Sequence, residues 1–210
     1  MSEPSSFRLA GSLGLAGLVS GLVLVGIYLG TLPTIQHNQA EALKAAIFRV
    51  LPDTATFKAM RVQGGKLAAD PSAEGKPPAP GEVVYAGFDK AGKSVGYAVP
   101  ANGNGFMDNI SLIFGYQESG KVIVGMEVLE SRETPGLGDK IINDAYFLKN
   151  FEALSVTPEI TPVKKGEKTA KNHVDCITGA TISSKAVVSI LNNAMNIWGK
   201  TLAGAQGATP

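Results

Sequence analysis

Cysteine, histidine and charged residues are all scarce in this chain of 210 residues. The only cysteine is Cys176, so an intrachain disulfide and a thiolate metal cluster are excluded. The two histidines, His37 and His173, are far apart and belong to no recognisable catalytic or metal-binding pattern, so we expect each to be exposed or hydrogen-bonded. Charged residues make up 18% of the chain and the net charge is +1, which does not indicate nucleic-acid binding. The glycine-rich fingerprints of Rossmann and P-loop nucleotide sites are also absent.

A long apolar stretch without charge runs from about Leu13 to Leu32. At about 1.5 Å per helical residue, roughly 20 residues span about 30 Å, the thickness of a bilayer core. The stretch exceeds the ~7–15 apolar residues of a signal peptide, and no small-x-small cleavage site follows it. We therefore predict an uncleaved, single-pass transmembrane helix at residues 12–33, after a short N-terminus at residues 1–11.

This stretch is rich in glycine, from Gly11 to Gly30. Gly17 with Gly21, and Gly26 with Gly30, form small-xxx-small pairs, which let neighbouring helices approach closely. The pattern predicts that the helix docks against partner subunits. The alternative is that glycine is simply common in transmembrane helices.

A second helical pattern follows the apolar stretch. Leu43, Ile47 and Val50 recur with helical spacing ahead of Pro52. The spacing predicts an amphipathic stalk helix at residues 34–52 that continues the membrane helix and packs on the domain.

Residues 53–82 are predicted to be rich in loops, because the part from about Gly64 to Gly81 is full of Pro, Gly, Lys and Ala. Residues 83–199 are predicted to form one domain, in which short β-rich runs and turns precede helices. The expected strands are 83–88, 94–99, 110–116 and 122–129, the turns 89–92 and 117–120, the short helix 144–151, the exposed connection 157–168 and the loose tail 200–210. This order predicts an α+β fold, with helices packed against an antiparallel sheet.

Small and hydroxyl-bearing side chains gather in the segment from Asp175 to Thr181, which reads DCITGAT. The next residues predict a helix to about Trp198, with Ser183 and Ser184 as candidate N-caps. Its apolar face is formed by Val187, Ile190, Leu191, Ala194 and Trp198. Thr181 is therefore expected just ahead of a helix N-terminus, where unpaired N–H groups and the helix dipole favour a phosphate. The alternative is an ordinary capped turn.

Two further segments have the composition of shaped loops. The first, from Ser131 to Gly138 (SRETPGLG), contains Pro135, which fixes one φ, and two glycines that permit positive φ. It is typical of a tight loop that follows a strand. The second, Ala101–Phe106 (ANGNGF), is by itself a plain turn with two glycines.

The DCITGAT segment resembles the flavinylation motif Asp-x-x-(Ser/Thr)-Gly-Ala-(Ser/Thr), matched by Asp175, Thr178, Gly179, Ala180 and Thr181. In that family a transferase attaches FMN through its phosphate to the last hydroxyl residue, so the resemblance implies a phosphoester at Thr181. The run at residues 133–138 is similar to the second signature of the FMN-binding domain. That domain is shared by the G subunit of the Rnf electron-transport complex and the C subunit of the sodium-translocating NADH:quinone oxidoreductase. The Rnf protein is the nearer resemblance because the chain is short.

The resemblance also implies flavin contacts outside the attachment motif. Glu133 and Thr134 are candidates for polar contacts with the flavin ring or for ordering the loop, and Leu137 is a candidate for covering a ring face. Gly138 belongs to the same predicted binding loop. The alternative is that these residues merely hold the turn. Residues 101–106 resemble a glycine-aromatic segment of these domains and are a weaker candidate for flavin contact.

The function implied by the resemblance is that of a membrane-anchored electron carrier with covalent FMN, a relay that couples ferredoxin and NAD redox chemistry to ion transport. Its partners would be the other membrane and redox subunits of an Rnf-type complex, and a flavin transferase during maturation. The helix would lie in the inner membrane, with the domain on the periplasmic or extracytoplasmic side. Arg8 before the span, and Lys44 and Arg49 after it, do not decide this direction. A membrane-anchored scaffold or binding module without flavin, and a self-standing reductase, are the alternatives.

Overall fold

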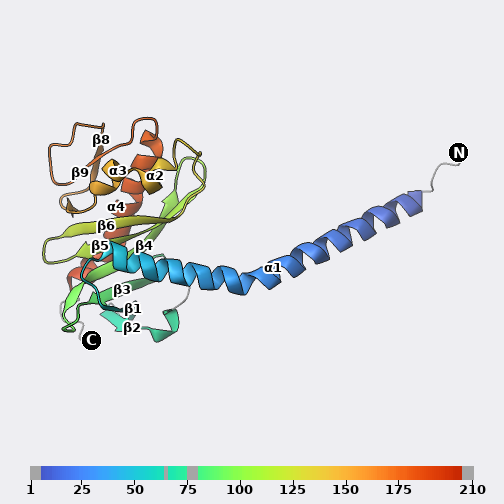
Figure 1. The fold of residues 1–210 in the computed structure, drawn as a ribbon, viewed down its shortest axis with the longest axis horizontal. Coiled ribbons are helices and arrows are strands. Elements are labelled where there is room, and N and C mark those ends of the chain that lie inside the picture. The colour runs from blue at the N-terminus through green and yellow to red at the C-terminus, as the bar shows by residue number, and fades with distance from the viewer. Residues whose placement is uncertain (1–5, 64–65, 75–79, 205–210) are drawn as a thin grey trace. The chain divides into compact units, whose positions relative to one another are not determined.

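The chain divides into two compact units, Met1–Gln39 and Ala40–Pro210. The computed structural model describes residues 6–63, 66–74 and 80–204 of them. Figure 1 shows a helix in the first unit, and a sheet flanked by helices in the second.

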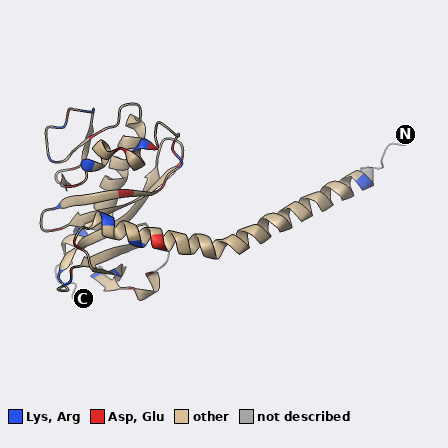
Figure 2. Cartoon of the chain, in the orientation of Figure 1, with Lys and Arg blue, Asp and Glu red and all other residues tan. Residues whose placement is uncertain are grey.

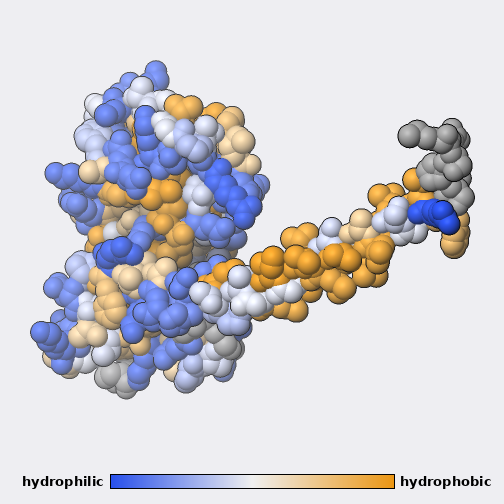
Figure 3. All heavy atoms as spheres, turned by 45° about the vertical axis from the view of Figure 1, so that its right-hand side comes forward, coloured by the Kyte–Doolittle hydropathy of each residue, from blue (hydrophilic) through white to orange (hydrophobic). Residues whose placement is uncertain are grey.

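Helix α1 runs from Ser6 to Val50 without interruption, through both helical segments that the sequence predicted. In the first unit its large apolar side chains are exposed, as Figure 3 shows along this part of the helix. No charged residue occurs between Arg8 and Glu41 (Figure 2). By length and composition α1 can therefore cross a membrane.

The last turns of α1 belong to the second unit and pack on the sheet. Leu43, Ile47 and Val50 are buried there, as their helical spacing predicted. The helix ends at Val50, because the residue before a proline, here Leu51, is disfavoured in the helical conformation. A Cβ atom at Gly115 of the sheet would overlap the carbonyl oxygen of Val50, so the helix end lies directly on the strand backbone.

Among the described residues, seven antiparallel strands form the main sheet, in the order β2-β1-β3-β4-β5-β6-β7. Their bounds are β1 Thr56–Gln63, β2 Lys66–Ala69, β3 Val83–Phe88, β4 Ser94–Asn104, β5 Asn109–Gln117, β6 Val122–Glu130 and β7 Leu154–Ser155. The strands predicted at 83–88, 94–99, 110–116 and 122–129 are confirmed as β3 to β6, and β4 is longer than expected.

The prediction of a loop-rich segment at residues 53–82 is wrong for β1, β2 and the short 3-10 helix Pro71–Ala73. Only Ala59 and Met60 of β1 are buried, so the strand lacks the strong apolar alternation that would have revealed it. It is fixed instead by pairing with β3 and by ion pairs of Arg61 with Asp70 and Glu82. Residues 64–65 and 75–79 of the predicted loop lie outside the described residues.

The sheet separates two hydrophobic cores, one for each face. Along β5, Leu112 and Phe114 belong to the core under the C-terminal helix, whereas Ile113 belongs to the core under the end of α1. Alternate residues of a strand point to opposite faces, so one strand supplies both cores. This arrangement confirms the predicted α+β fold.

Short elements connect β6 to the C-terminal helix. Besides β7, these are α2 Lys140–Asn143, α3 Ala145–Lys149, β8 Thr161–Val163 and β9 His173–Asp175. The predicted helix 144–151 is shorter than expected. It begins after its N-cap Asp144, which accepts a hydrogen bond from the N–H of Phe147 at 2.9 Å, and it ends at Lys149. The predicted exposed connection 157–168 was wrong in one part, because β8 within it pairs in parallel with β9.

Helix α4, Thr181–Ala203, covers the other face of the sheet. The predicted N-caps Ser183 and Ser184 are wrong: both are buried inside the first turns, and the N-cap position is Ala180. Their hydroxyls make tertiary hydrogen bonds instead of capping the helix. The predicted apolar face is confirmed as buried, and the helix continues past Trp198 into the predicted tail, of which residues 205–210 lie outside the described residues.

Candidate functional site

A cavity of about 320 Å³ lies at the N-terminal end of α4. This volume is within the range of roughly 300–1,000 Å³ that is typical of small-molecule sites. Segments remote in sequence line it: the turn after β4, the loop after β6 and the start of α4. The structure thereby brings together most of the residues that the resemblance singled out, namely Glu133, Thr134, Leu137, Gly138, Gly179, Ala180 and Thr181.

Thr181 is the first residue of α4, and it is exposed. The preceding turn is held in place by backbone geometry and by one serine. Gly179 has a φ of +85°, which side-chain-bearing residues rarely adopt. The hydroxyl of Ser184 donates to the carbonyl of Ala180 at 2.9 Å and accepts from the N–H of Ile177 at 3.0 Å. The Thr181 hydroxyl is therefore presented at a fixed and accessible position.

The start of α4 suits an anion. The first N–H groups of a helix have no intrahelical acceptor, and the side chain of Ala180 at the N-cap position supplies none. The helix dipole adds positive potential at this end. Lys185 lies one turn along the helix from Thr181 and is exposed, so it adds positive charge near the same face.

Glu133 joins the segments that line the cavity. It is only 5% exposed, and its Oε1 accepts hydrogen bonds from the N–H groups of Phe106 at 2.8 Å and Met107 at 3.0 Å. Its Oε2 accepts the hydroxyl of Ser183. Burial alone would raise the pKa of Glu133, but hydrogen bonds from Ser183, Met107 and Phe106 outweigh it and hold the pKa below its usual value. The carboxylate is therefore ionised at neutral pH.

The loop after β6 has the tight geometry that its composition predicted. Gly136 has a φ of +75°, whereas Gly138 is needed for close packing. A Cβ atom at Gly138 would lie 2.7 Å from Glu133 Oε2 and 2.8 Å from Ser183 Oγ. A side chain at this position would therefore separate the loop from α4.

Three apolar side chains of the cavity are open to solvent. Phe106, Leu137 and Ile182 are 59%, 50% and 59% exposed. Such side chains offer contact area to a flat aromatic ring. Phe106 belongs to the weaker candidate segment 101–106, whereas Ile182 and Ser183 were not predicted as site residues. Apart from the N-cap prediction for Ser183, the sequence signal for these two was their position directly after Thr181.

Asp175 and Thr178, the remaining residues of the flavinylation motif, do not line the cavity. Asp175 is 3% exposed, and its carboxylate accepts hydrogen bonds from the Tyr146 hydroxyl at 2.7 Å and the Gly166 N–H at 3.1 Å. It thereby ties α3 and the loop after β8 to the strand that leads into the turn. Thr178 is exposed.

The cysteine and the two histidines of the chain do not line the larger cavity. Cys176 is a free thiol, 3% exposed, and burial raises its pKa. His37 is exposed, and His173 is half-buried with its Nδ1 3.4 Å from the N–H of Thr169, as expected for isolated histidines.

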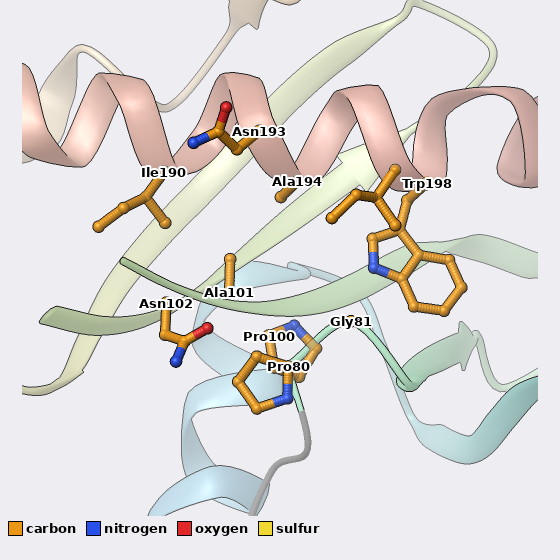
Figure 4. Close-up of a pocket in the computed structure, with 10 residues that line it drawn as sticks. Pro80, Gly81, Pro100, Ala101, Asn102, Ile190, Asn193, Ala194 and Trp198 are labelled. Atoms are coloured by element: carbon orange, nitrogen blue, oxygen red, sulfur yellow. The ribbon is translucent and has the colours of Figure 1, made fainter. Parts of the chain in front are cut away.

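A smaller cavity, of about 100 Å³, lies farther along α4 over β4. Figure 4 shows Ile190 and Trp198 of the helix on one side, and Asn102 and Pro100 of the strand on the other. Its lining contains no acidic, basic or thiol side chain. It therefore lacks the groups that acid–base or nucleophilic chemistry requires, and the larger cavity is the candidate functional site.

Comparison with known proteins agrees with this assignment. Residues 105–196, which contain every residue of the larger cavity, match the FMN-binding domain. Solved structures that share the fold include two C subunits. NqrC of Shewanella oneidensis has a TM-score of 0.62 and 16% identity, over 80% of this chain and 99% of that one. The C subunit of the Na(+)-translocating NADH-quinone reductase of Parabacteroides distasonis has a TM-score of 0.61 and 21% identity, over 79% and 94%.

Relatives of higher identity extend over most of the chain. The G subunit of the ion-translocating oxidoreductase complex of Methanosarcina acetivorans is 34% identical over 85% of this chain and 86% of its own length. The G subunit of the Na(+)-translocating ferredoxin:NAD(+) oxidoreductase complex of Acetobacterium woodii is 33% identical over 80% and 79%. With an FMN-binding domain around the cavity and relatives of this identity along its length, the chain belongs to the G-subunit family of Rnf-type ion-translocating oxidoreductase complexes.

Proposed function

We propose that this chain is a membrane-anchored electron carrier in which FMN is esterified through its phosphate to Thr181. The observation that carries the proposal is the exposed hydroxyl of Thr181, at the uncapped start of α4 and at the edge of a cavity of about 320 Å³. That cavity lies within residues that match the FMN-binding domain.

The residues at the start of α4 fit a flavin phosphate. A phosphate monoester carries about two negative charges at neutral pH, and a second ester bond leaves one. The free N–H groups and the helix dipole stabilise that charge by about 0.3–1 kcal/mol at an exposed site. The exposed cation of Lys185 acts in the same direction.

The rest of the cavity fits the flavin ring. Leu137, Phe106 and Ile182 supply apolar surface for the ring, and Thr134 supplies a hydroxyl within the lining. Gly138 and Glu133 shape the cavity, while Asp175 and Thr178 act from outside it by fixing and flanking the turn that presents Thr181. A ring bound in this way receives its potential from its surroundings, while the cofactor itself carries the electrons.

Attachment is a phosphoryl transfer that needs a flavin transferase. Thr181 Oγ1 would form the ester bond to the flavin phosphorus while a phosphoanhydride bond of a flavin dinucleotide donor breaks. A nucleoside monophosphate would be the leaving group, and the hydroxyl proton would pass to a base of the transferase. The exposure of Thr181 supports this route, because an enzyme must reach the hydroxyl from outside.

The proposed location follows from α1 and from the family. The helix provides a span at residues 12–33, and we propose that the domain lies on the extracytoplasmic side of the cell inner membrane. There, a covalent bond prevents loss of the flavin by diffusion. The proposed partners are the other membrane and redox subunits of an Rnf-type complex. In this proposal the flavin is one electron relay of that complex, which couples ferredoxin and NAD redox chemistry to ion transport.

The attachment site is tested by Thr181→Ala in cells that make the flavin transferase. We expect in-gel flavin fluorescence to disappear, with the free energy of unfolding changed by less than about 0.5 kcal/mol, since an exposed hydroxyl contributes little. Ser189→Ala removes another exposed hydroxyl of α4 and should keep full fluorescence. Mass spectrometry of the peptide that contains Thr181 should show the added FMN. Fluorescence that persists in Thr181→Ala would refute the site.

The side of the membrane on which the domain lies is tested by protease accessibility. In intact spheroplasts, external protease should digest the domain after Thr34. Protection of the domain until lysis would place it in the cytoplasm and reject the proposed location.

A further inference from the structure

The turn from Gly105 to Asp108 depends on a side chain far away in the sequence. Within the turn, the N–H of Gly105 donates to the carbonyl of Asp108 at 2.8 Å. The N–H groups of Phe106 and Met107 both donate to one carboxylate oxygen of Glu133. The placement of this turn, which carries Phe106 into the cavity lining, therefore rests on Glu133.

The same carboxylate holds the first turn of α4. Its second oxygen accepts the hydroxyl of Ser183, a residue that is 3% exposed and lies two positions after Thr181. Glycines stand on both sides of the carboxylate: a Cβ atom at Gly105 would overlap Oε1, and one at Gly138 would lie 2.7 Å from Oε2. The carboxylate is thus enclosed by the segments that it binds. We call Glu133, with the N–H groups of Phe106 and Met107 and the hydroxyl of Ser183, the Glu133 clamp.

We propose that Glu133 is a positioning residue: the Glu133 clamp fixes the Phe106 turn relative to the Thr181 attachment point, and it does so before any flavin is present. Both carboxylate oxygens already accept hydrogen bonds from the protein, so their strongest acceptor positions serve the protein and not a ligand. Hydrogen bonds to an ionised acceptor are about twice as strong as neutral ones, which suits a structural link across three segments. An exposed ion pair of Arg132 with Asp108, at 3.5 Å, adds a second link to the same turn.

The clamp has a specific consequence for an attached flavin. The phosphoester would fix one end of FMN at Thr181, while the ring would lie against side chains that include Phe106. The clamp then sets the distance between the attachment point at Thr181 and the position of the ring beside Phe106. The ring therefore binds without a rearrangement of the protein. This consequence rests on the proposed function, whereas the clamp itself does not.

The clamp is tested first without flavin, by hydrogen exchange of the full chain in detergent, in a Thr181→Ala background. The N–H groups of Phe106 and Met107 owe their protection to Glu133. We therefore expect Glu133→Ala to speed exchange in the peptide that contains them about tenfold, the effect of losing one charge-assisted hydrogen bond. Glu133→Gln keeps an acceptor oxygen and should restore most of the protection. Glu152→Ala removes an exposed carboxylate that has no part in the clamp and should leave the exchange unchanged.

The second arm measures the attached flavin in chains that retain Thr181. Glu133→Ala and Ser183→Ala should both lower the fluorescence anisotropy of the flavin, because the ring becomes mobile, while Glu152→Ala should not. If Glu133→Ala fails to fold, Ser183→Ala still tests the positioning role by anisotropy, because it removes only one hydrogen bond of the clamp. Unchanged exchange at Phe106 and Met107 in Glu133→Ala would overturn the clamp, and unchanged anisotropy would overturn its positioning role. Absence of flavin from the unmutated chain would refute the proposed function while the exchange results still decide on the clamp.

Discussion

The two faces of the sheet meet their helices in different ways. On one face the end of α1 lies against strand backbone, where Gly115 leaves no room for a Cβ atom, and Arg49 pairs with Glu127 at 2.7 Å. On the other face α4 packs through apolar side chains such as Leu191, and its N-terminal end borders the larger cavity. The face that holds the end of α1 is thus closely packed, while the opposite face combines packing with an open cavity.

This difference predicts that the two faces respond differently to mutation. Changes under α1 should lower the free energy of unfolding and leave flavin attachment intact in the chains that fold. Changes around the start of α4 should alter the flavin with little effect on stability. The following variants test this separation, in order of decreasing effect on the free energy of unfolding.

Gly115→Ala should have the largest effect on stability. The added methyl group overlaps the carbonyl oxygen of Val50, so the helix end must shift, which costs about 1–3 kcal/mol. Gly199→Ala is the matched control, because its Cβ would meet Met195 Cε at an ordinary 3.6 Å and alanine favours a helix interior. Chemical denaturation measures both. Loss of flavin from folded Gly115→Ala would show that the faces are not separate.

Lowering the pH should also reduce the free energy of unfolding, through Glu133 on the α4 face, and by less than Gly115→Ala does. The pKa of Glu133 in the folded chain lies below the ordinary 4.5, so its stabilisation is fully present above pH 4.5 and is lost as the pH falls through the lower folded value. Glu133→Gln lacks this ionisation. Thermal denaturation between neutral pH and pH 3 should therefore show a difference in stability between the unmutated chain and Glu133→Gln, and this difference should become smaller below pH 4.5. A difference that becomes larger in acid would contradict the assigned direction.

Leu137→Asp should have the smallest effect on stability and a clear effect on the flavin. Leu137 is half exposed, so its replacement changes the free energy of unfolding by less than about 0.5 kcal/mol. A charge at the cavity should shift the absorption spectrum or midpoint potential of the attached flavin, because the ring responds to nearby charge. Val62→Asp, an exposed apolar position on β1, is the control and should leave the spectrum unchanged. An unchanged spectrum in Leu137→Asp would exclude contact between this loop and the ring.

Sequence patterns predicted the elements with strong periodicity. The apolar faces of α1 and α4 were visible as helical periodicity, and β3 to β6 were visible as short β-rich runs between turns, because these residues are buried in the two cores. Strand β1 was missed because only Ala59 and Met60 of it are buried, and pairing with β3 decides its conformation. The start of α4 was misplaced because Ser183 and Ser184 look like caps, while their hydroxyls serve Glu133 and the turn before the helix.

The residues of the candidate site were predicted from motifs, but their arrangement in space was not. The resemblance named Thr181 and the loop from Glu133 to Gly138, and the structure places them around one cavity. A motif does not tell which members line a cavity, so the inward orientation of Asp175 toward Tyr146 came only from the structure. The link from Glu133 to Ser183 joins residues 50 positions apart, and a local pattern cannot show such a contact.

The burial of Cys176 has a practical consequence for following the maturation of this protein. A thiol that is 3% exposed reacts with alkylating reagents only when its surroundings open. Cys176 lies five residues before Thr181, in the segment of the proposed attachment site, and is the only cysteine of the chain. Its rate of alkylation therefore reports how often this segment opens, without any engineered label. If FMN is attached at Thr181 as proposed, comparing that rate before and after attachment would show how far the cofactor closes this segment.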